Sequence, residues 1–162
     1  MKPALPALRI ATIAVFLAAA PACAPDDIVG AGGYWTPAGH WAGQVIITQD
    51  PDDARWPADA VTITSATVQG DSISLDVTYG GGCRDHSFAL LANTAWMESY
   101  PVQVRVRLAH EGMGDRCKAL LARTVRFDLS PLRSVYASSY GTATGVIRLR
   151  LDNAPSSPTY AF

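Results

Sequence analysis

Residues 72–79, with the sequence SISLDVTY, alternate polar and apolar side chains without a break. The apolar positions are Ile73, Leu75, Val77 and Tyr79. Successive side chains of a β-strand point to opposite faces of its sheet, so this period of two predicts a half-buried strand. Its apolar face is expected to pack on a core and its polar face to meet water. This stretch indicates a β-rich fold.

The segments around this strand predict further strands. Residues 61–68 are rich in β-branched side chains, and Gly70-Asp71 supplies a turn, so we expect a hairpin with the strand at 72–79. The same strict alternation recurs over residues 102–110 and 146–152. Shorter strand candidates lie at 45–48, 87–91, 124–129 and 159–162.

One short helix is expected after the candidate strand at 124–129. Ser130 is predicted to be its N-cap and Pro131 its first helical residue. Helical segments do not alternate with the strands, which argues against a parallel βαβ sheet. About seven or eight short strands separated by turns predict an all-β fold, an antiparallel β-sandwich formed by residues 43–162.

The amino-terminal residues have the three parts of a secretory signal. Lys2 and Arg9 precede the apolar run 10–20, and a small-residue exit ends at Ala22. This run is about half as long as the roughly 20 residues that a membrane-spanning helix needs. We therefore expect residues 1–22 to be a signal peptide and the protein to be exported.

The end of this signal resembles the lipobox of bacterial lipoproteins. Ala22 fits the pattern, whereas Ala20 and Pro21 depart from it. The resemblance implies that Cys23 is the acylated first residue of the mature protein. Several acyl chains would anchor it to the bacterial membrane, on the periplasmic or the surface face. Residues 23–42 are then expected to be a lipid-anchored tether.

The charge balance argues against a nucleic-acid partner. The chain has 13 basic and 14 acidic side chains, a net charge of −1. Without Lys2 and Arg9 the mature part has 11 basic against 14 acidic side chains, and it has no clustered basic segment. No cofactor is expected. The expected partners are the membrane, through the lipid anchor, and an envelope protein or a glycan as ligand.

The three cysteines are an odd number for an exported protein. Acylation of Cys23 would remove it from the count and leave Cys83 and Cys117. In an oxidising compartment these two are expected to form a disulfide.

A metal site is the alternative for the same cysteines. They lie close in the sequence to two histidines, in the segments 80–88 (GGGCRDHSF) and 108–117 (LAHEGMGDRC). Two thiolates and two imidazoles are a tetrahedral zinc set, although the spacing is not that of a standard zinc finger. This alternative is a metal-binding module that uses Cys83, His86, His110 and Cys117.

A hydrolase is a second alternative. His110 continues the apolar face of its strand, which predicts a buried imidazole bonded to a backbone carbonyl or to an acid. His86 with Asp85 or Asp115 has the composition of a base oriented by a carboxylate, so His86 or His110 could act in catalysis. No serine occupies a strand–turn–helix elbow, however. The sequence favours a non-enzymatic protein with a binding or structural role.

The glycine run 80–82 is a weak phosphate-binding motif, because it leads into a strand rather than a helix. We expect it to form a bend in which glycine permits positive φ and a close approach of the backbone.

Residues 61–151 resemble the C-terminal β-sandwich of the NigD-like lipoproteins. The similarity rests on Cys-x2-His-x-Phe at 83–88, on His110 followed by Asp-x-Cys at 115–117, and on Phe-Asp-Leu at 127–129. It implies a lipid-anchored envelope protein with no assigned enzymatic activity. That family carries an extra small barrel domain before the sandwich, and residues 24–60 are expected to be too few to form one. Any role of that domain is not implied.

Overall fold

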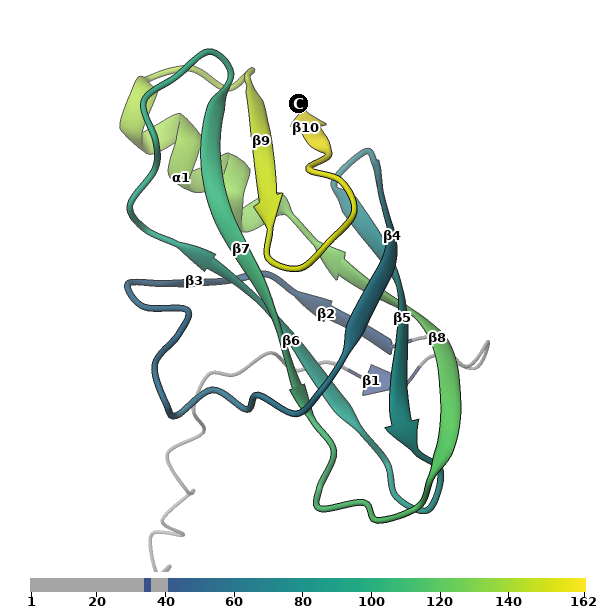
Figure 1. Ribbon diagram of the computed structural model, residues 1–162. Coiled ribbons are helices and arrows are strands. Elements are labelled where there is room, and N and C mark those ends of the chain that lie inside the picture. The colour runs from purple at the N-terminus through teal and green to yellow at the C-terminus, as the bar shows by residue number, and fades with distance from the viewer. Residues whose placement is uncertain (1–33, 36–40) are drawn as a thin grey trace, which may run out of the picture.

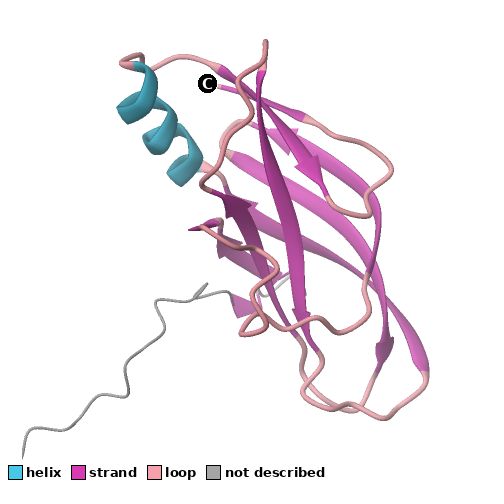
Figure 2. Cartoon of the chain, turned by 60° about the vertical axis from the view of Figure 1, so that its left-hand side comes forward, coloured by secondary structure: helices cyan, strands magenta, loops and turns pink. Residues whose placement is uncertain are grey.

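The computed structural model describes residues 34–35 and 41–162 of the chain. The described strands form two five-stranded sheets that pack face to face (Figures 1 and 2). The expected all-β sandwich is thereby confirmed. The expected signal peptide, residues 1–22, and the expected lipidation site Cys23 lie outside the described residues.

Ten strands and one helix make up the described part. One sheet contains, in spatial order, β1 (Tyr34–Trp35), β2 (Trp41–Gln44), β8 (Ala119–Asp128), β5 (Ser72–Gly81) and β4 (Thr62–Gln69). The other contains β10 (Thr159–Ala161), β9 (Val146–Leu151), β7 (Val102–Glu111), β6 (Ser87–Asn93) and β3 (Ile46–Thr48). The helix α1 (Ser130–Tyr140) lies at one end of the sandwich (Figure 2).

The sheets are mixed, which corrects the expectation of purely antiparallel pairing. β2 pairs with β8, β3 with β6 and β7 with β9 in parallel. β2 and β3 are separated only by Val45, so one short stretch of chain contributes a strand to each sheet. The alternation of side chains predicts which face of a strand is buried, but it holds no information on the direction of the neighbouring strand.

The amino-terminal edge of the sandwich also differs from the expectation. β1 lies within the segment 23–42 that was expected to be a tether, and β2 begins in it. The sandwich therefore starts before residue 43. These two strands are 2 and 4 residues long, too short to show an alternating pattern in a Gly/Pro-rich segment.

The core is built from the apolar faces that the alternating patterns predict. In β5, Leu75 has no exposed surface, and its strand alternates buried with partly or fully exposed residues. Eight apolar residues of the three alternating segments, each on the face predicted to be buried, are buried in the structure: Ile73, Leu75, Val77, Val104, Val106, Leu108, Ile147 and Leu149.

The helix begins where expected, but its cap differs. Leu129 is the N-cap residue, and Ser130 is already the first helical residue. The carboxylate of Asp128 accepts hydrogen bonds from the Ser130 N–H at 2.9 Å and from the Ser130 hydroxyl at 2.7 Å. Asp128, at the end of β8, therefore supplies the acceptor that was expected from Ser130.

Among the described residues, none of the helical structure has the length and apolar character of a membrane-spanning helix.

Candidate functional site

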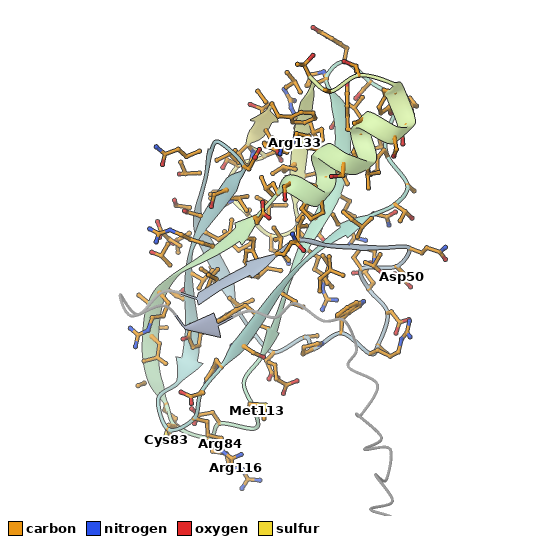
Figure 3. The ribbon with its side chains drawn as sticks, turned by 180° about the vertical axis from the view of Figure 1, so that it is seen from behind. Asp50, Cys83, Arg84, Met113, Arg116 and Arg133 are labelled. Atoms are coloured by element: carbon orange, nitrogen blue, oxygen red, sulfur yellow. A yellow bond between two sulfur atoms is a disulfide. The ribbon has the colours of Figure 1, made fainter. Side chains whose placement is uncertain are left out.

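Two loops meet at the end of the sandwich opposite α1 (Figure 1). Residues 82–86 connect β5 to β6 and residues 112–118 connect β7 to β8; we call these two loops the tip. A disulfide between Cys83 and Cys117 joins them, with 5.8 Å between the Cα atoms. The expected disulfide is thereby confirmed. Figure 3 shows Cys83 at this end of the molecule, close to Arg84, Met113 and Arg116.

The carboxylate of Asp115 organises the tip from inside. Its Oδ2 accepts hydrogen bonds from the backbone N–H groups of Gly82, Cys83 and Arg84, at 2.8, 2.9 and 3.0 Å. Its Oδ1 accepts one from the N–H of Cys117 at 2.8 Å. The N–H groups of Cys117 and Cys83 contribute most to holding the pKa of Asp115 well below its ordinary value. The buried carboxylate of Asp115 therefore holds both loops together through hydrogen bonds to their backbones.

Two buried histidines continue from this anion into the core. Nε2 of His86 lies 3.3 Å from Oδ2 of Asp115, and Nδ1 of His86 lies 2.8 Å from Nε2 of His110. Nδ1 of His110 then lies 3.2 Å from the carbonyl oxygen of Ala60. The exposed fractions of the His86 and Asp115 side chains are 3% and 1%. Hydrogen bonds thus connect Asp115, His86, His110 and Ala60 in series.

The partners of the two outer ring nitrogens decide their roles. The acceptors at the two ends, Asp115 and the Ala60 carbonyl, have no proton to give, so each outer nitrogen donates. Burial is the largest cause that lowers the pKa of His110.

Aromatic rings pack around this hydrogen-bonded series. The Phe88 ring is stacked on His110, with centroids 4.8 Å apart and an interplanar angle of 9°. The Tyr79 ring lies 4.7 Å from the His86 ring and 5.0 Å from the His110 ring. Tyr79 belongs to one sheet and Phe88 and His110 to the other, so the cluster joins the two sheets below the tip.

The glycine bend is present where expected. Gly81 has φ +152° and Gly82 has φ +120°. A Cβ atom on Gly81 would lie 2.5 Å from Nε2 of His86 and 2.9 Å from Oδ2 of Asp115. Glycine is therefore required at position 81 because the His86–Asp115 pair occupies the space of a side chain.

The structure decides between the two carboxylates that were expected near the histidines. Asp115 bonds His86, whereas Asp85 is exposed and does not take part in the series. His110 is bonded to a backbone carbonyl, one of the two partners expected for it, but no sequence pattern indicates its bond to His86. Six of the residues that carry the NigD-like resemblance lie together in this cluster: Cys83, His86, Phe88, His110, Asp115 and Cys117. The Phe-Asp-Leu motif at 127–129 lies at the other end of β8, beside α1.

The alternative metal set is not assembled in this structure. The two sulfur atoms that would be thiolate ligands are bonded to each other. Within the described residues, the group with metal-ligand atoms within 4.8 Å of one another consists of Cys83, Asp115 and Cys117, and neither histidine belongs to it. Oxidation removes the two negative charges that would attract zinc.

The geometry of a hydrolase is also missing from the described part. Both nitrogens of His86 and both of His110 lie within hydrogen-bond distance of partners inside the protein. A general base needs a nitrogen that can reach a substrate or a nucleophile. Neither ring lines the open hollow at the tip, which has a volume of about 530 Å³.

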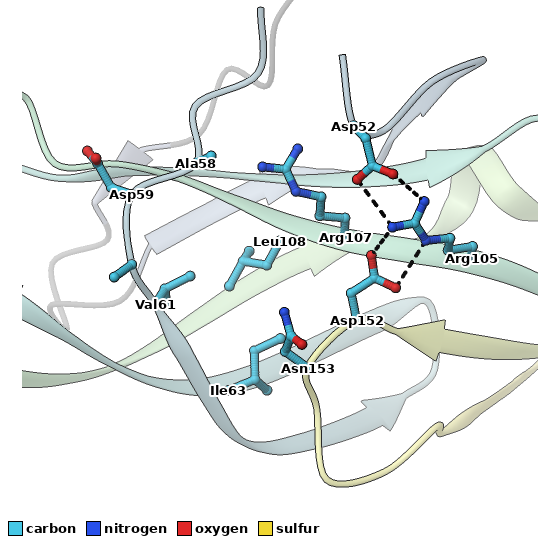
Figure 4. A pocket seen from close by; sticks show the side chains of 11 residues that line it. Asp52, Ala58, Asp59, Val61, Ile63, Arg105, Arg107, Leu108, Asp152 and Asn153 are labelled. Carbon is cyan, nitrogen blue, oxygen red and sulfur yellow. Dashed lines mark hydrogen bonds and ion pairs between the residues drawn. The ribbon is translucent and has the colours of Figure 1, made fainter. Parts of the chain in front are cut away.

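A second cavity, of about 340 Å³, lies beside β7 (Figure 4). On one of its walls Arg105 bonds the carboxylates of Asp52 and Asp152, each with a shortest N–O distance of 2.6 Å. These hydrogen bonds, that of Asp152 first, raise the pKa of Arg105 further above its ordinary value. The alternation of β7 predicts that Arg105 faces outward, but its partners lie 47 and 53 residues away in the sequence.

The fold and the site define a disulfide-bonded β-sandwich whose two described histidines are held in internal hydrogen bonds. No known family matches the chain in sequence, and no curated protein matches it. Solved structures do match. A NigD-like immunity protein from Bacteroides caccae is 15% identical, with a TM-score of 0.50, over 72% of this chain and 58% of that chain. The chain thus corresponds to less than two thirds of that protein.

Two other solved structures are similar. A candidate lipoprotein from Bacteroides fragilis is 12% identical, with a TM-score of 0.49, over 75% of this chain and 68% of that chain. A protein of unknown function from Bacteroides vulgatus is 17% identical, with a TM-score of 0.46, over 75% of this chain and 58% of that chain. The resemblance to NigD-like proteins that the residues indicate is matched by the similarity of fold to the Bacteroides caccae protein.

Proposed function

We propose that the chain is an exported, lipid-anchored β-sandwich protein of the bacterial envelope, with a binding or structural role and no enzymatic activity. The observation that carries this proposal is the tip itself. Its cysteines form a disulfide, and its histidines are held by Asp115, by each other and by a backbone carbonyl. A disulfide of this kind suits an oxidising, extracytoplasmic compartment, in agreement with the signal-like residues 1–22.

The proposed lack of enzymatic activity is supported by how the two described histidines are used. In a catalytic pair, the base keeps one nitrogen for the substrate while a carboxylate orients the other. Here the nitrogen of His86 that would serve the substrate is bonded to His110. His110 in turn has its second nitrogen on the carbonyl of Ala60. The series stabilises the loops and leaves no nitrogen of His86 or His110 free for chemistry.

The lipid anchor is supported by the cysteine count and by the signal. Cys83 and Cys117 are bonded to each other, so Cys23 is the remaining cysteine of the chain. A cysteine that follows an export signal directly is where bacterial lipoproteins are acylated. Several acyl chains on Cys23 would hold the protein on the membrane without a spanning helix.

The anchor is tested by expressing the full chain in a bacterium and isolating its membranes. The mature wild-type protein should begin at Cys23, have the mass of an acylated chain and require detergent for its release. Cys23→Ser should lose this acyl mass. The matched control is the double variant Cys83→Ser, Cys117→Ser, which should keep the acyl mass. A wild-type chain that begins at residue 23 without acyl groups would contradict the lipid anchor.

A further inference from the structure

The open hollow at the tip is lined by both charged and apolar groups. Its volume is about 530 Å³, and it is lined by the disulfide, by Arg84 and Arg116, and by Met113. Figure 3 shows both arginines at the extremity of the molecule, next to Met113. Met113 is 56% exposed. The hollow therefore combines two guanidinium groups with an apolar surface.

The basic side chains of the tip have no ion-pair partner among the described residues. Arg84, Arg116 and Lys118 are exposed, and no ion pair of the described part includes any of them. By contrast, Arg105 and Arg133 both form ion pairs with aspartates. Nη1 of Arg84 donates to the carbonyl oxygen of Met113 at 2.8 Å, which fixes its guanidinium at the hollow.

The acidic residue that lines the hollow does not cancel this charge. Asp115 is held by four backbone N–H groups and by His86, and its side chain is 1% exposed. Its negative charge is therefore directed inward. The exposed charges of residues 82–86 and 112–118 are three basic groups and one acid, Asp85.

The tip is also rigid before any ligand arrives. The disulfide joins the two loops covalently, and Asp115 bonds the backbone of both. A preorganised site loses little conformational entropy when it binds. Loops held in this way at the end of a sandwich are where such folds place their binding residues.

We propose that this hollow binds a phosphate group, with the guanidinium groups of Arg84 and Arg116 as its ligands. Two arginine forks can share the three terminal oxygens of a phosphate ester, whereas a carboxylate offers only two. The volume exceeds that of a phosphate alone, so we assign the ligand to the class of phosphate esters. The organic part of the ester lies against Met113 and the disulfide.

This site deepens the binding role proposed above and rests on it only for the location of the tip outside the cytoplasm. The phosphate could come from a lipid or glycolipid headgroup or from the free anion. The probes are therefore glycerol phosphate, which carries the headgroup chemistry, and inorganic phosphate. The full chain in neutral detergent is titrated with each, and binding is followed by calorimetry and by the amide resonances of the tip.

The expected result is saturable binding that shifts the amide resonances of both loops. Arg116→Gln should raise the dissociation constant about tenfold, because a charged, bidentate partner is lost. Arg116→Lys should recover only part of this loss, since an ammonium group keeps the charge without the fork. Arg148→Gln is the matched control, because Arg148 is an exposed arginine of β9, and it should bind like the wild type.

Tighter binding of glycerol phosphate than of inorganic phosphate supports a headgroup ligand. The reverse order contradicts the assignment to phosphate esters and indicates the free anion. The proposal is overturned if neither probe binds saturably, or if Arg116→Gln and Arg148→Gln weaken binding equally. Arg116 makes no hydrogen bond or ion pair within the described residues, so its substitution should leave the tip folded, which the melting temperature verifies. The state of Cys23 does not enter this experiment, so the proposed anchor and the proposed site fail separately.

Discussion

Nδ1 of His86 and Nε2 of His110 lie 2.8 Å apart in the core beneath the tip. His110 lies in β7 and His86 in the loop directly before β6, and the two residues are 24 positions apart in the sequence. Because Asp115 and the Ala60 carbonyl occupy the outer nitrogens, this contact accounts for every nitrogen of both rings. The histidines therefore belong to the structure of the tip, and their titration should affect its stability.

Acid should destabilise the protein in two steps. The pKa of His110 is lowered from 6.5, so below about pH 6.5 the unfolded chain takes up a proton there that the folded chain does not. The unfolding free energy should therefore fall as the pH drops from 7 to 5. The pKa of Asp115 is lowered from 3.8, so its contribution is present above about pH 3.8 and is lost below it.

Urea unfolding at pH 7, 6 and 5 measures the first step. His110→Gln, which cannot take up a proton there, should be less stable at pH 7 and should show a smaller loss between pH 7 and 5. A wild-type unfolding free energy that rises on acidification over this interval would contradict the lowered pKa of His110.

Gly81→Ala should destabilise the tip. The added Cβ would lie 2.5 Å from Nε2 of His86, and the backbone at φ +152° favours glycine. Overpacking of this kind costs about 1–3 kcal/mol, to which backbone strain adds. Gly80→Ala is the matched control, because a Cβ at position 80 meets no atom within 4 Å. In thermal unfolding, Gly81→Ala should have a lower melting temperature than Gly80→Ala. Equal melting temperatures would show that His86 and Asp115 can move to accommodate the added Cβ atom.

Leu75→Ala should cost roughly 2–5 kcal/mol, the usual range for a leucine truncated in a packed core. Leu75 has no exposed surface in β5. Arg148→Ala, on the exposed face of β9, should change stability little. Arg105→Ala should fall between them, because it breaks the hydrogen bonds to Asp52 and Asp152. Denaturant titration gives the order, and a cost for Leu75→Ala no larger than that for Arg148→Ala would refute the packing of β5.

Removal of the disulfide should lower stability by roughly 3–4 kcal/mol in the chain-entropy estimate. The bond closes a loop between residues 34 apart in the sequence. The double variant Cys83→Ser, Cys117→Ser should melt at a markedly lower temperature, while a chelator should leave the wild type unchanged. Titration of two free thiols in the purified wild type, together with unfolding on chelation, would instead support the metal-binding alternative.

The alternating segments show how much of the fold is local. The pattern of residues 72–79 predicts strand β5 and its buried face, because a period of two is a property of consecutive residues. The same argument predicts the buried faces of β7 and β9. The direction of neighbouring strands depends on the path of the chain between them. For that reason the local pattern could not predict the three parallel pairings.

The candidate site divides in the same way. The cysteine count predicted the Cys83–Cys117 bond, and the apolar face of its strand predicted the burial of His110. The choice of Asp115 over Asp85 required the positions of both loops, since the two carboxylates are equivalent as residue types.

The sequence by itself determined the β-rich fold, the buried faces of its long strands and the pairing of its two later cysteines. Each of these depends on local periodicity or on a count. Only the tertiary structure decided that His86 bonds His110, that Asp115 lies beneath Gly81, and that Arg84 and Arg116 line one hollow. These contacts join residues 24 to 34 positions apart, and their geometry is set by the register of strands and the closure of loops, which no local pattern encodes.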